Sequence, residues 1–247
     1  IDAKPVKLSA EQRTALRARQ RETEKAAEAE QKQKNDRAAR QAMHTWGKLA
    51  ATGASAYLER KGVGAFGVKF SPSGALAVPM ADTHGRIHGL QIIRPDKKNG
   101  RDKDFWPAGL AKKGHFHIVG GLSSAAGAVI LLAEGYATAA SLHMATGLPV
   151  VVAFDAGNLG PVAAAIHGKY KLARLLICAD DDYLTDGNPG VTHASNAALA
   201  VAGAWVAPVF AVDRDGKKIT DFNDLHASEG LGAVRAQIEA KLAALGW

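Results

Sequence analysis

Three acidic side chains follow two apolar segments, in positions where their carboxylates could bind a metal ion together. Glu134 comes just after the apolar run of residues 128–132, and Asp180 and Asp182 come just after residues 175–178. Short runs of this kind are typical of buried strands. If the two strands are parallel neighbours, the carboxylates meet at one carboxyl edge of the sheet, where open α/β sheets bind ligands. Carboxylate oxygens suit hard divalent cations, so the pattern predicts a magnesium site fit for phosphoryl transfer.

The three consecutive aspartates, residues 180–182, are not expected to point to the same side of the chain. Alternate residues of an extended segment project to the same side. Asp180 and Asp182 are therefore expected to face the metal together. Asp181 is expected to point away, as a solvated or helix-capping acid.

From residue 121 onward, the chain alternates strands and helices in the manner of a parallel sheet. Gly147 is a residue type favoured just beyond a helix end, so it is expected to close the first helix. The expected elements are a helix at residues 136–146, a strand at 148–154, a helix at 191–203, a strand at 206–212 and an amphipathic helix at 231–245.

Two polar residues follow the predicted strand at 148–154. Asp155 and Asn158 are therefore expected beside the metal site, as contacts to a nucleotide or as supports of the metal ligands. Gly157 and Gly160 favour a tight turn in this stretch.

The first 50 residues have the composition of a long charged helix, rich in Glu, Gln, Lys, Arg and Ala. Ser9 and Gln12 have the spacing of a capping box, which predicts the start of that helix. Two interpretations stay open. The helix is either a solvated linker or a nucleic-acid contact made by four arginines: Arg13, Arg17, Arg19 and Arg21.

Residues 51–120 have a different pattern, with short strands and turns. The apolar runs at 75–80 and 87–93 flank a turn and predict a β-hairpin. A polar loop is expected at residues 95–104. The chain is thus expected to comprise a charged helical segment at 1–50, a small basic α+β subdomain at 51–120 and an α/β domain at 121–247.

The charge of the chain is unevenly distributed along these segments. Residues 1–50 carry 12 basic and 7 acidic side chains, residues 51–120 carry 11 and 5, and residues 121–247 carry 8 and 12. A basic front half joined to an acidic half with clustered carboxylates predicts a groove for a polyanion beside a metal site.

Composition excludes several other classes of protein. The chain has one cysteine, Cys178, which rules out an internal disulfide and a four-cysteine zinc ribbon and favours a reducing cytoplasm. No apolar run approaches the ~20 residues of a membrane span. No phosphate-binding loop of the helicase type is present. Because the chain does not begin with Met, we interpret it as part of a longer protein.

The string EGYATA at residues 134–139, followed by a hydrophobic strand ending in Asp-x-Asp, resembles the Toprim domain. More narrowly, it resembles the primases of conjugative plasmids and satellite phages. The resemblance implies that Asp180 and Asp182 hold Mg²⁺ or Mn²⁺, and that Glu134 is a metal ligand or a proton-handling group. The acid that the family usually has four residues after the glutamate is replaced here by Thr138, which leaves the number of metal ions open.

The same resemblance extends to other charged residues. Asp221 and Asp224 match a third acidic cluster of primases, which implies a further metal or the triphosphate bound through it; the alternative is an N-cap of the last helix. Residues 51–120 resemble the basic subdomain of bacterial primase cores. By that resemblance Arg94, Lys103 and Lys113 contact template or triphosphate, although each can also be a plain surface charge.

The resemblance therefore favours a DNA primase core that copies single-stranded DNA into short RNA primers from ribonucleoside triphosphates. A plasmid or phage role is implied, with a replicative helicase or a relaxase as partner, in trans or fused outside this segment, and without a membrane. Two alternatives stay open. One is a Toprim-type nuclease or topoisomerase-like enzyme that cleaves phosphodiesters, and the other is a non-catalytic module that binds nucleic acid.

Overall fold

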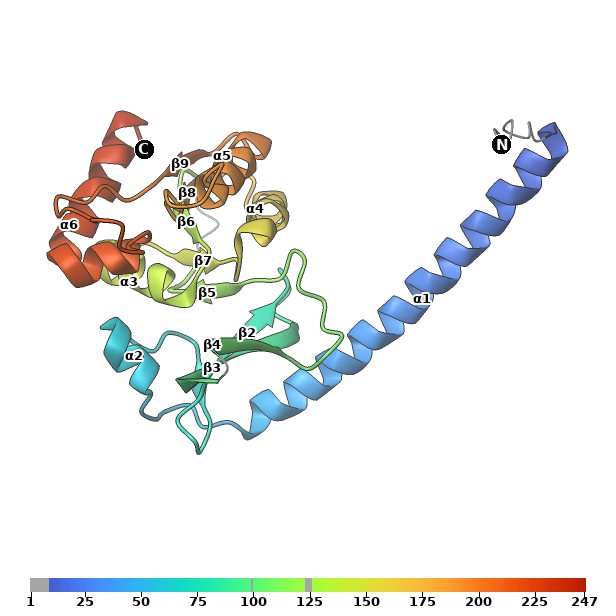
Figure 1. The fold of residues 1–247 in the computed structure, drawn as a ribbon, viewed down its shortest axis with the longest axis horizontal. Coiled ribbons are helices and arrows are strands. Elements are labelled where there is room, and N and C mark those ends of the chain that lie inside the picture. Colours follow the sequence, from blue (N-terminus) through green and yellow to red (C-terminus); the bar gives the residue numbers. More distant parts are fainter. Residues whose placement is uncertain (1–8, 99, 123–125) are drawn as a thin grey trace, which may run out of the picture.

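The computed structural model describes residues 9–98, 100–122 and 126–247. The first eight residues of the predicted segment 1–50 therefore lie outside the described residues. The described chain has two lobes, each built on one sheet, and a long helix that projects away from them (Figure 1). Among the described residues, no helix combines the length and apolar character that a membrane-spanning segment requires.

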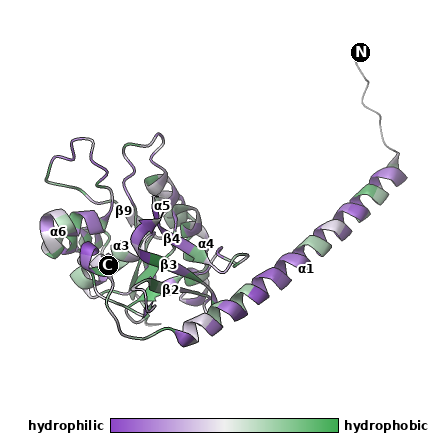
Figure 2. Ribbon diagram, turned by 60° about the horizontal axis from the view of Figure 1, so that its bottom comes forward, coloured by the Kyte–Doolittle hydropathy of each residue, from purple (hydrophilic) through white to green (hydrophobic). Residues whose placement is uncertain are grey.

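The projecting helix is α1 (Ala10–Lys48), and its predicted start is confirmed. The Ser9 hydroxyl accepts a hydrogen bond from the Gln12 backbone nitrogen at 3.1 Å, and the Gln12 side chain accepts one from the Ser9 nitrogen at 2.8 Å. Most of α1 is exposed and hydrophilic (Figure 2). It contacts the body near its C-terminal end, where Ala38, Ala39 and Ala42 are buried.

The smaller sheet has four antiparallel strands in sequential order: β1 (Lys69–Phe70), β2 (Leu76–Ala81), β3 (Ile87–Lys98) and β4 (Arg101–Trp106). The predicted hairpin is confirmed, because β2 pairs with β3. The predicted loop at 95–104 is wrong, because β3 continues to Lys98 and pairs with β4, which lies at the edge of the sheet. An edge strand can carry many charged side chains in solvent, and those charges resemble a loop in sequence.

The larger sheet has five strands in the order β5-β7-β6-β8-β9. Its strands are β5 (His117–Val119), β6 (Val129–Ala133), β7 (Val150–Val152), β8 (Arg174–Cys178) and β9 (Ala204–Val206). Neighbours β6 and β8 are parallel, as the sequence predicted, with Ala133 opposite Cys178. β5 is the antiparallel edge strand, and it comes just before the predicted boundary at residue 121.

Helices cover both faces of the larger sheet (Figure 1). They are α3 (Tyr136–Thr146) and α6 (Phe222–Ala244) on one face, and α4 (Ala156–Lys169) and α5 (Pro189–Ala200) on the other. Successive residues of the central strand β6 point to opposite faces of the sheet. Leu131 packs on the side of α3 and α6, and Leu132 packs on the side of α4 and α5. The core on the α3 side continues into the smaller sheet and α2 (Ala56–Lys61), so the two lobes share one apolar core.

Two expectations for this domain are wrong. The strand expected at 206–212 is β9, which ends at Val206. Pro208 cannot donate to a strand, and the Val209 and Ala211 nitrogens donate instead to the side chains of Gln237 (3.0 Å) and Glu229 (2.8 Å) of α6. The tight turn expected at Gly157 and Gly160 is the first part of α4.

Candidate active site

Glu134 and Asp180 lie at the carboxyl ends of two adjacent parallel strands. β6 ends at Ala133 and β8 ends at Cys178, which pair with each other, so the next residues of both strands leave the sheet at the same edge. Both acids line one pocket of about 150 Å³. A pocket of this size is smaller than the ~300 Å³ or more of a typical small-molecule site, so it fits part of a ligand, such as a phosphate group or an ion.

A third acid and two lysines complete the charged lining of this pocket. Asp221 comes from the N-terminus of α6, Lys103 from β4 and Lys61 from α2. The pocket therefore draws on both lobes. Its remaining lining residues are Tyr57, Gly135, Ala137, Thr138 and Phe154.

Two carboxylate oxygens at this site have no protein partner. Glu134 Oε1 and Asp180 Oδ1 are buried and accept no hydrogen bond from any described residue. Burial and then the charges of Asp182, Asp155 and Asp221 raise the pKa of Glu134 to about 7. Burial and then the charge of Glu134 raise the pKa of Asp180 well above its ordinary value. Buried, unpartnered and mutually repelling carboxylates are the electrostatic environment in which a cation is most favourable.

Asp182 and Asp224 lie next to this pocket but are not among its lining residues. Asp182 Oδ2 accepts a hydrogen bond from the Gly190 nitrogen at 3.2 Å, in the first turn of α5. Asp224 forms the capping box of α6 with Asp221 and lies 3.8 Å from the Lys61 ammonium group. Asp221 is thus the N-cap of α6, as one of the two interpretations of the sequence expected, and it also lines the pocket. Burial and then the charge of Asp224 raise the pKa of Asp221.

The other predicted contact residues are placed in different surroundings. Arg94 forms an ion pair with Asp104, and Lys113 is exposed, with neither residue in the pocket lining. Asp155 caps α4 and pairs with the Lys112 ammonium group.

Asn158 is buried and holds backbone groups together. Its amide nitrogen donates to the His115 and Ala153 carbonyl oxygens at 3.0 and 2.8 Å, and its amide oxygen accepts from the Gly114 nitrogen at 2.8 Å. Both N–H donors of this side chain are occupied, so in this arrangement Asn158 supports the strand end next to the pocket.

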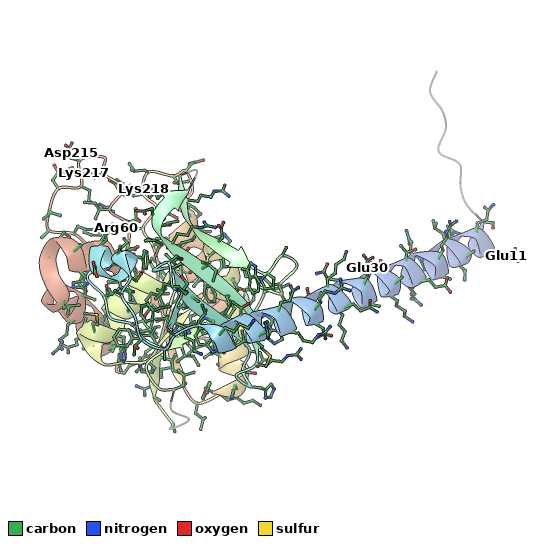
Figure 3. The ribbon with its side chains drawn as sticks, turned by 90° about the horizontal axis from the view of Figure 1, so that it is seen from below. Glu11, Glu30, Arg60, Asp215, Lys217 and Lys218 are labelled. Atoms are coloured by element: carbon green, nitrogen blue, oxygen red, sulfur yellow. The ribbon has the colours of Figure 1, made fainter. Side chains whose placement is uncertain are left out.

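Sequence reasoning missed Tyr57 and Lys61 of α2, and it missed Arg214. α2 has six residues, which is too short for a helical period to be recognised. Arg214 forms an ion pair with Asp181, which was expected to be solvated or to cap a helix. Arg214 lies in the segment between β9 and α6, and Figure 3 shows Asp215, Lys217 and Lys218 of this segment at the end of the molecule opposite Glu11 of α1.

The carboxylate oxygens of the pocket are of the type that binds a hard cation, but they are not arranged as a complete set of ligands around one. No group of three or more His, Cys, Asp or Glu side chains in the described parts of the chain is arranged to hold a metal ion. The unpartnered oxygens of Glu134 and Asp180, with Asp221 in the same pocket, are oxygen donors of the kind that Mg²⁺ prefers. These residues would supply oxygen ligands to a divalent cation.

Comparison with known proteins identifies the larger lobe. Residues 129–232 match the Toprim domain family. This part of the chain is a Toprim domain. The Toprim resemblance and the predicted fold class, a parallel-sheet domain preceded by a small α+β unit and an N-terminal helix, are confirmed.

Two Escherichia coli proteins named DNA primase TraC are similar to more than the Toprim domain. One is 37% identical over 216 residues, which is 85% of this chain and 19% of the relative. The other is 40% identical over 162 residues, or 63% of this chain and 11% of the relative. The chain thus spans about a fifth or less of the length of these relatives.

Solved primase structures share the fold of both lobes. A DnaG primase catalytic domain bound to ssDNA has a TM-score of 0.56 at 17% identity, covering 86% of this chain and 80% of that structure. The Aquifex aeolicus primase, with its zinc-binding and RNA polymerase domains, has a TM-score of 0.54 at 16% identity, covering 85% and 61%. At these identities the likeness is one of fold.

Proposed function

We propose that this chain is the catalytic core of a DNA primase, which copies single-stranded DNA into short RNA primers. The observation that carries the proposal is the single pocket that holds unpartnered oxygens of Glu134 and Asp180 together with Lys103 of the other lobe. Such a pocket offers carboxylate oxygens to a cation and an ammonium group to a phosphate. The similarity to DNA primase TraC, which extends over both lobes, supports this choice among Toprim activities.

In this proposal, Glu134, Asp180 and Asp221 hold Mg²⁺ or Mn²⁺ from the protein side, with Asp182 and Asp224 adding negative charge nearby. A bound divalent cation neutralises charge that develops on the transferred phosphoryl group. If Glu134 is instead the proton-handling group and does not bind the cation, its pKa of about 7 would let the carboxylate accept a proton from the attacking hydroxyl near neutral pH. The helix cap made by Asp221 and the hydrogen bond that Asp182 accepts from the Gly190 nitrogen fix the directions of these side chains before ligands bind.

The basic residues have two roles in the proposal. Lys61 and Lys103 line the pocket and bind the phosphates of an incoming ribonucleoside triphosphate. Arg94 and Lys113, outside the pocket, bind the phosphate backbone of the template. Asp155 and Asn158 position the strand end beside the pocket.

The wider setting is also proposed. The core acts in plasmid or phage replication or conjugation, with a helicase or relaxase as partner. The chain divides functionally into the helical segment 1–50, the basic subdomain 51–120 and the Toprim domain 121–247. The length of the TraC relatives leaves room for such partners within one polypeptide.

The test is primer synthesis on single-stranded DNA with labelled ribonucleotides and either Mg²⁺ or Mn²⁺. Wild type is compared with Asp180→Asn and with Glu134→Gln, which remove charge without changing shape. Asp186→Asn is the matched control, because Asp186 is an exposed acid close to the same aspartate motif. Short RNA from wild type and Asp186→Asn, but not from the two pocket variants, would support the proposal.

Other outcomes point elsewhere. If wild type cuts the DNA without nucleotides and the pocket variants do not, the activity is that of a nuclease. If wild type makes no RNA and cuts no DNA, the primase proposal is rejected for this chain.

A further inference from the structure

A buried tyrosine in the pocket carries a hydroxyl group that the fold does not use. Tyr57 of α2 is 1% exposed, and its hydroxyl oxygen has no hydrogen-bond partner among the described residues. An unsatisfied buried polar group costs roughly 1–3 kcal/mol of stability. A phenylalanine would fill the same space without that cost, so the hydroxyl is not explained by folding.

A second buried tyrosine, Tyr136, lies outside the pocket lining and shows the opposite arrangement. The Tyr136 hydroxyl donates to the Gly64 carbonyl oxygen at 2.9 Å and accepts from the Phe66 nitrogen at 2.7 Å. That hydroxyl fixes the loop after α2 to α3 and is fully used inside the protein. The contrast between the two residues isolates Tyr57 as the one with a free polar group.

The surroundings of Tyr57 favour an anionic ligand. The Arg60 guanidinium carbon and the Lys103 ammonium nitrogen each lie 5.8 Å from the centre of its ring. Lys61 and Lys103 line the pocket with it, together with the acids Glu134, Asp180 and Asp221.

The protonation state of the hydroxyl follows from its surroundings. Burial and then the charges of Asp102 and Asp221 raise the pKa of Tyr57. The hydroxyl therefore keeps its proton and serves as a donor.

We propose that the Tyr57 hydroxyl donates a hydrogen bond to a phosphate oxygen of the nucleotide, next to Lys61 and Lys103. This assignment rests on the proposed function for its ligand, a nucleoside triphosphate. The hydroxyl is shielded from solvent, so contact requires a pocket side chain to move. We expect that side chain to be Lys103, which lines the pocket and is an exposed residue on an edge strand.

The proposal predicts an unusual combination for Tyr57→Phe. Without ligand, the variant loses nothing from folding, so its unfolding temperature equals or exceeds that of wild type. With ligand, it lacks one hydrogen bond to a charged group, so ATP with Mg²⁺ binds roughly tenfold to a hundredfold more weakly. A residue with a purely structural role would change stability first.

Two matched controls come from the same region. Tyr136→Phe removes a hydroxyl that is fully bonded, so it should lower the unfolding temperature and leave ATP affinity within about twofold. Ser55→Ala removes another buried hydroxyl without a described partner, which lies outside the pocket lining. That variant should bind ATP as tightly as wild type. Its stability should equal that of wild type or be slightly higher.

The measurements are thermal unfolding without ligand, and calorimetric titration with ATP and with inorganic pyrophosphate in Mg²⁺. Weaker binding of both ligands to Tyr57→Phe at unchanged or higher stability supports the proposal. Equal affinities of Tyr57→Phe and wild type, no binding to wild type, or a loss confined to ATP would each overturn it. A wild type that binds ATP in this pattern but makes no primer would reject the primase proposal and leave the Tyr57 assignment standing.

Discussion

Arg214 and Asp181 form an ion pair in which Nη1 lies 2.7 Å from Oδ2, and this pair connects two acidic segments of the site. Arg214 also lies over the ring of Tyr183, with its guanidinium carbon 3.8 Å from the ring centre. The backbone nitrogen of Asp181 donates to the Thr220 carbonyl oxygen at 2.8 Å, one residue before Asp221. The contacts thus fix the segment before α6 against the end of β8, and with it the position of Asp221.

We expect Arg214→Ala to lower the free energy of unfolding by about 1–3 kcal/mol, because it leaves the half-buried Asp181 carboxylate without its cation. Asp181→Ala should cost a similar amount, and the double variant less than the sum, which denaturant unfolding would measure. The control is Arg86→Ala, which breaks an exposed ion pair with Asp36 at 3.1 Å and should cost under about 1 kcal/mol. Strictly additive losses for Arg214 and Asp181 would contradict the coupling.

The sequence was sufficient to predict which edge of the larger sheet carries the site and that Glu134 and Asp180 lie there. The apolar runs at β6 and β8 have the length of buried strands, and parallel neighbours must bring Glu134 and Asp180 to one edge. The start of α1 was also predicted, from the capping-box spacing of Ser9 and Gln12. These features depend on short stretches of chain.

The parts of the site that the sequence did not predict depend on contacts between distant residues. Tyr57 and Lys61 reach the pocket from a six-residue helix more than 70 residues before Glu134. The start of helix α4 was missed because Gly157 and Gly160 suggested a turn, although Leu159, Val162 and Ile166 have a helical spacing. Here tertiary packing overrides weak local propensity.

Glu134→Gln should stabilise the protein at pH 8 in the absence of divalent cations. The pKa of Glu134 is raised to about 7, so the folded state holds its proton over a pH range in which the unfolded state has released it. Stability therefore falls as pH rises from about 4.5 to about 7, by about 1–3 kcal/mol, and the amide removes this loss. Unfolding temperatures at pH 5 and pH 8 would show a gain at pH 8 only. The control is Glu239→Gln, an exposed acid on α6, and a gain of equal size there would refute the explanation.

The same variant should respond less to Mg²⁺. A cation that binds the folded protein stabilises it by mass action, and loss of one carboxylate weakens that binding. The rise in unfolding temperature with added MgCl₂ should therefore be smaller in Glu134→Gln than in wild type, whereas the Glu239→Gln control should match wild type. An equal rise in all three proteins would exclude Glu134 from the cation site.

His117 should make the protein less stable in mild acid. This side chain is buried between the lobes, with Nε2 2.8 Å from the Phe66 carbonyl oxygen, and burial lowers its pKa to about 4, with that hydrogen bond acting in the opposite direction. The unfolded state takes up a proton near pH 6.5, so stability is lost as pH falls from about 6.5 to about 4, by up to roughly 3 kcal/mol. His117→Gln should flatten this part of the unfolding profile, whatever its effect at pH 7. His84→Gln, at an exposed turn, should leave the profile unchanged, and identical profiles for all three proteins would refute the assignment.

Gly190 should be the position in α5 at which an added methyl group damages the site most directly. A Cβ atom there would clash with the carbonyl oxygen of Asp180, a backbone atom that cannot move without displacing the carboxylate. We expect Gly190→Ala to lower the free energy of unfolding by at least about 2 kcal/mol and to weaken Mg²⁺-dependent ATP binding. Gly168→Ala is the matched control, because its methyl group would enter open space within α4 and should stabilise the protein by about 0.5–1 kcal/mol. If Gly190→Ala unfolds like wild type and binds ATP equally well, then the close approach of α5 to Asp180 does not position this carboxylate.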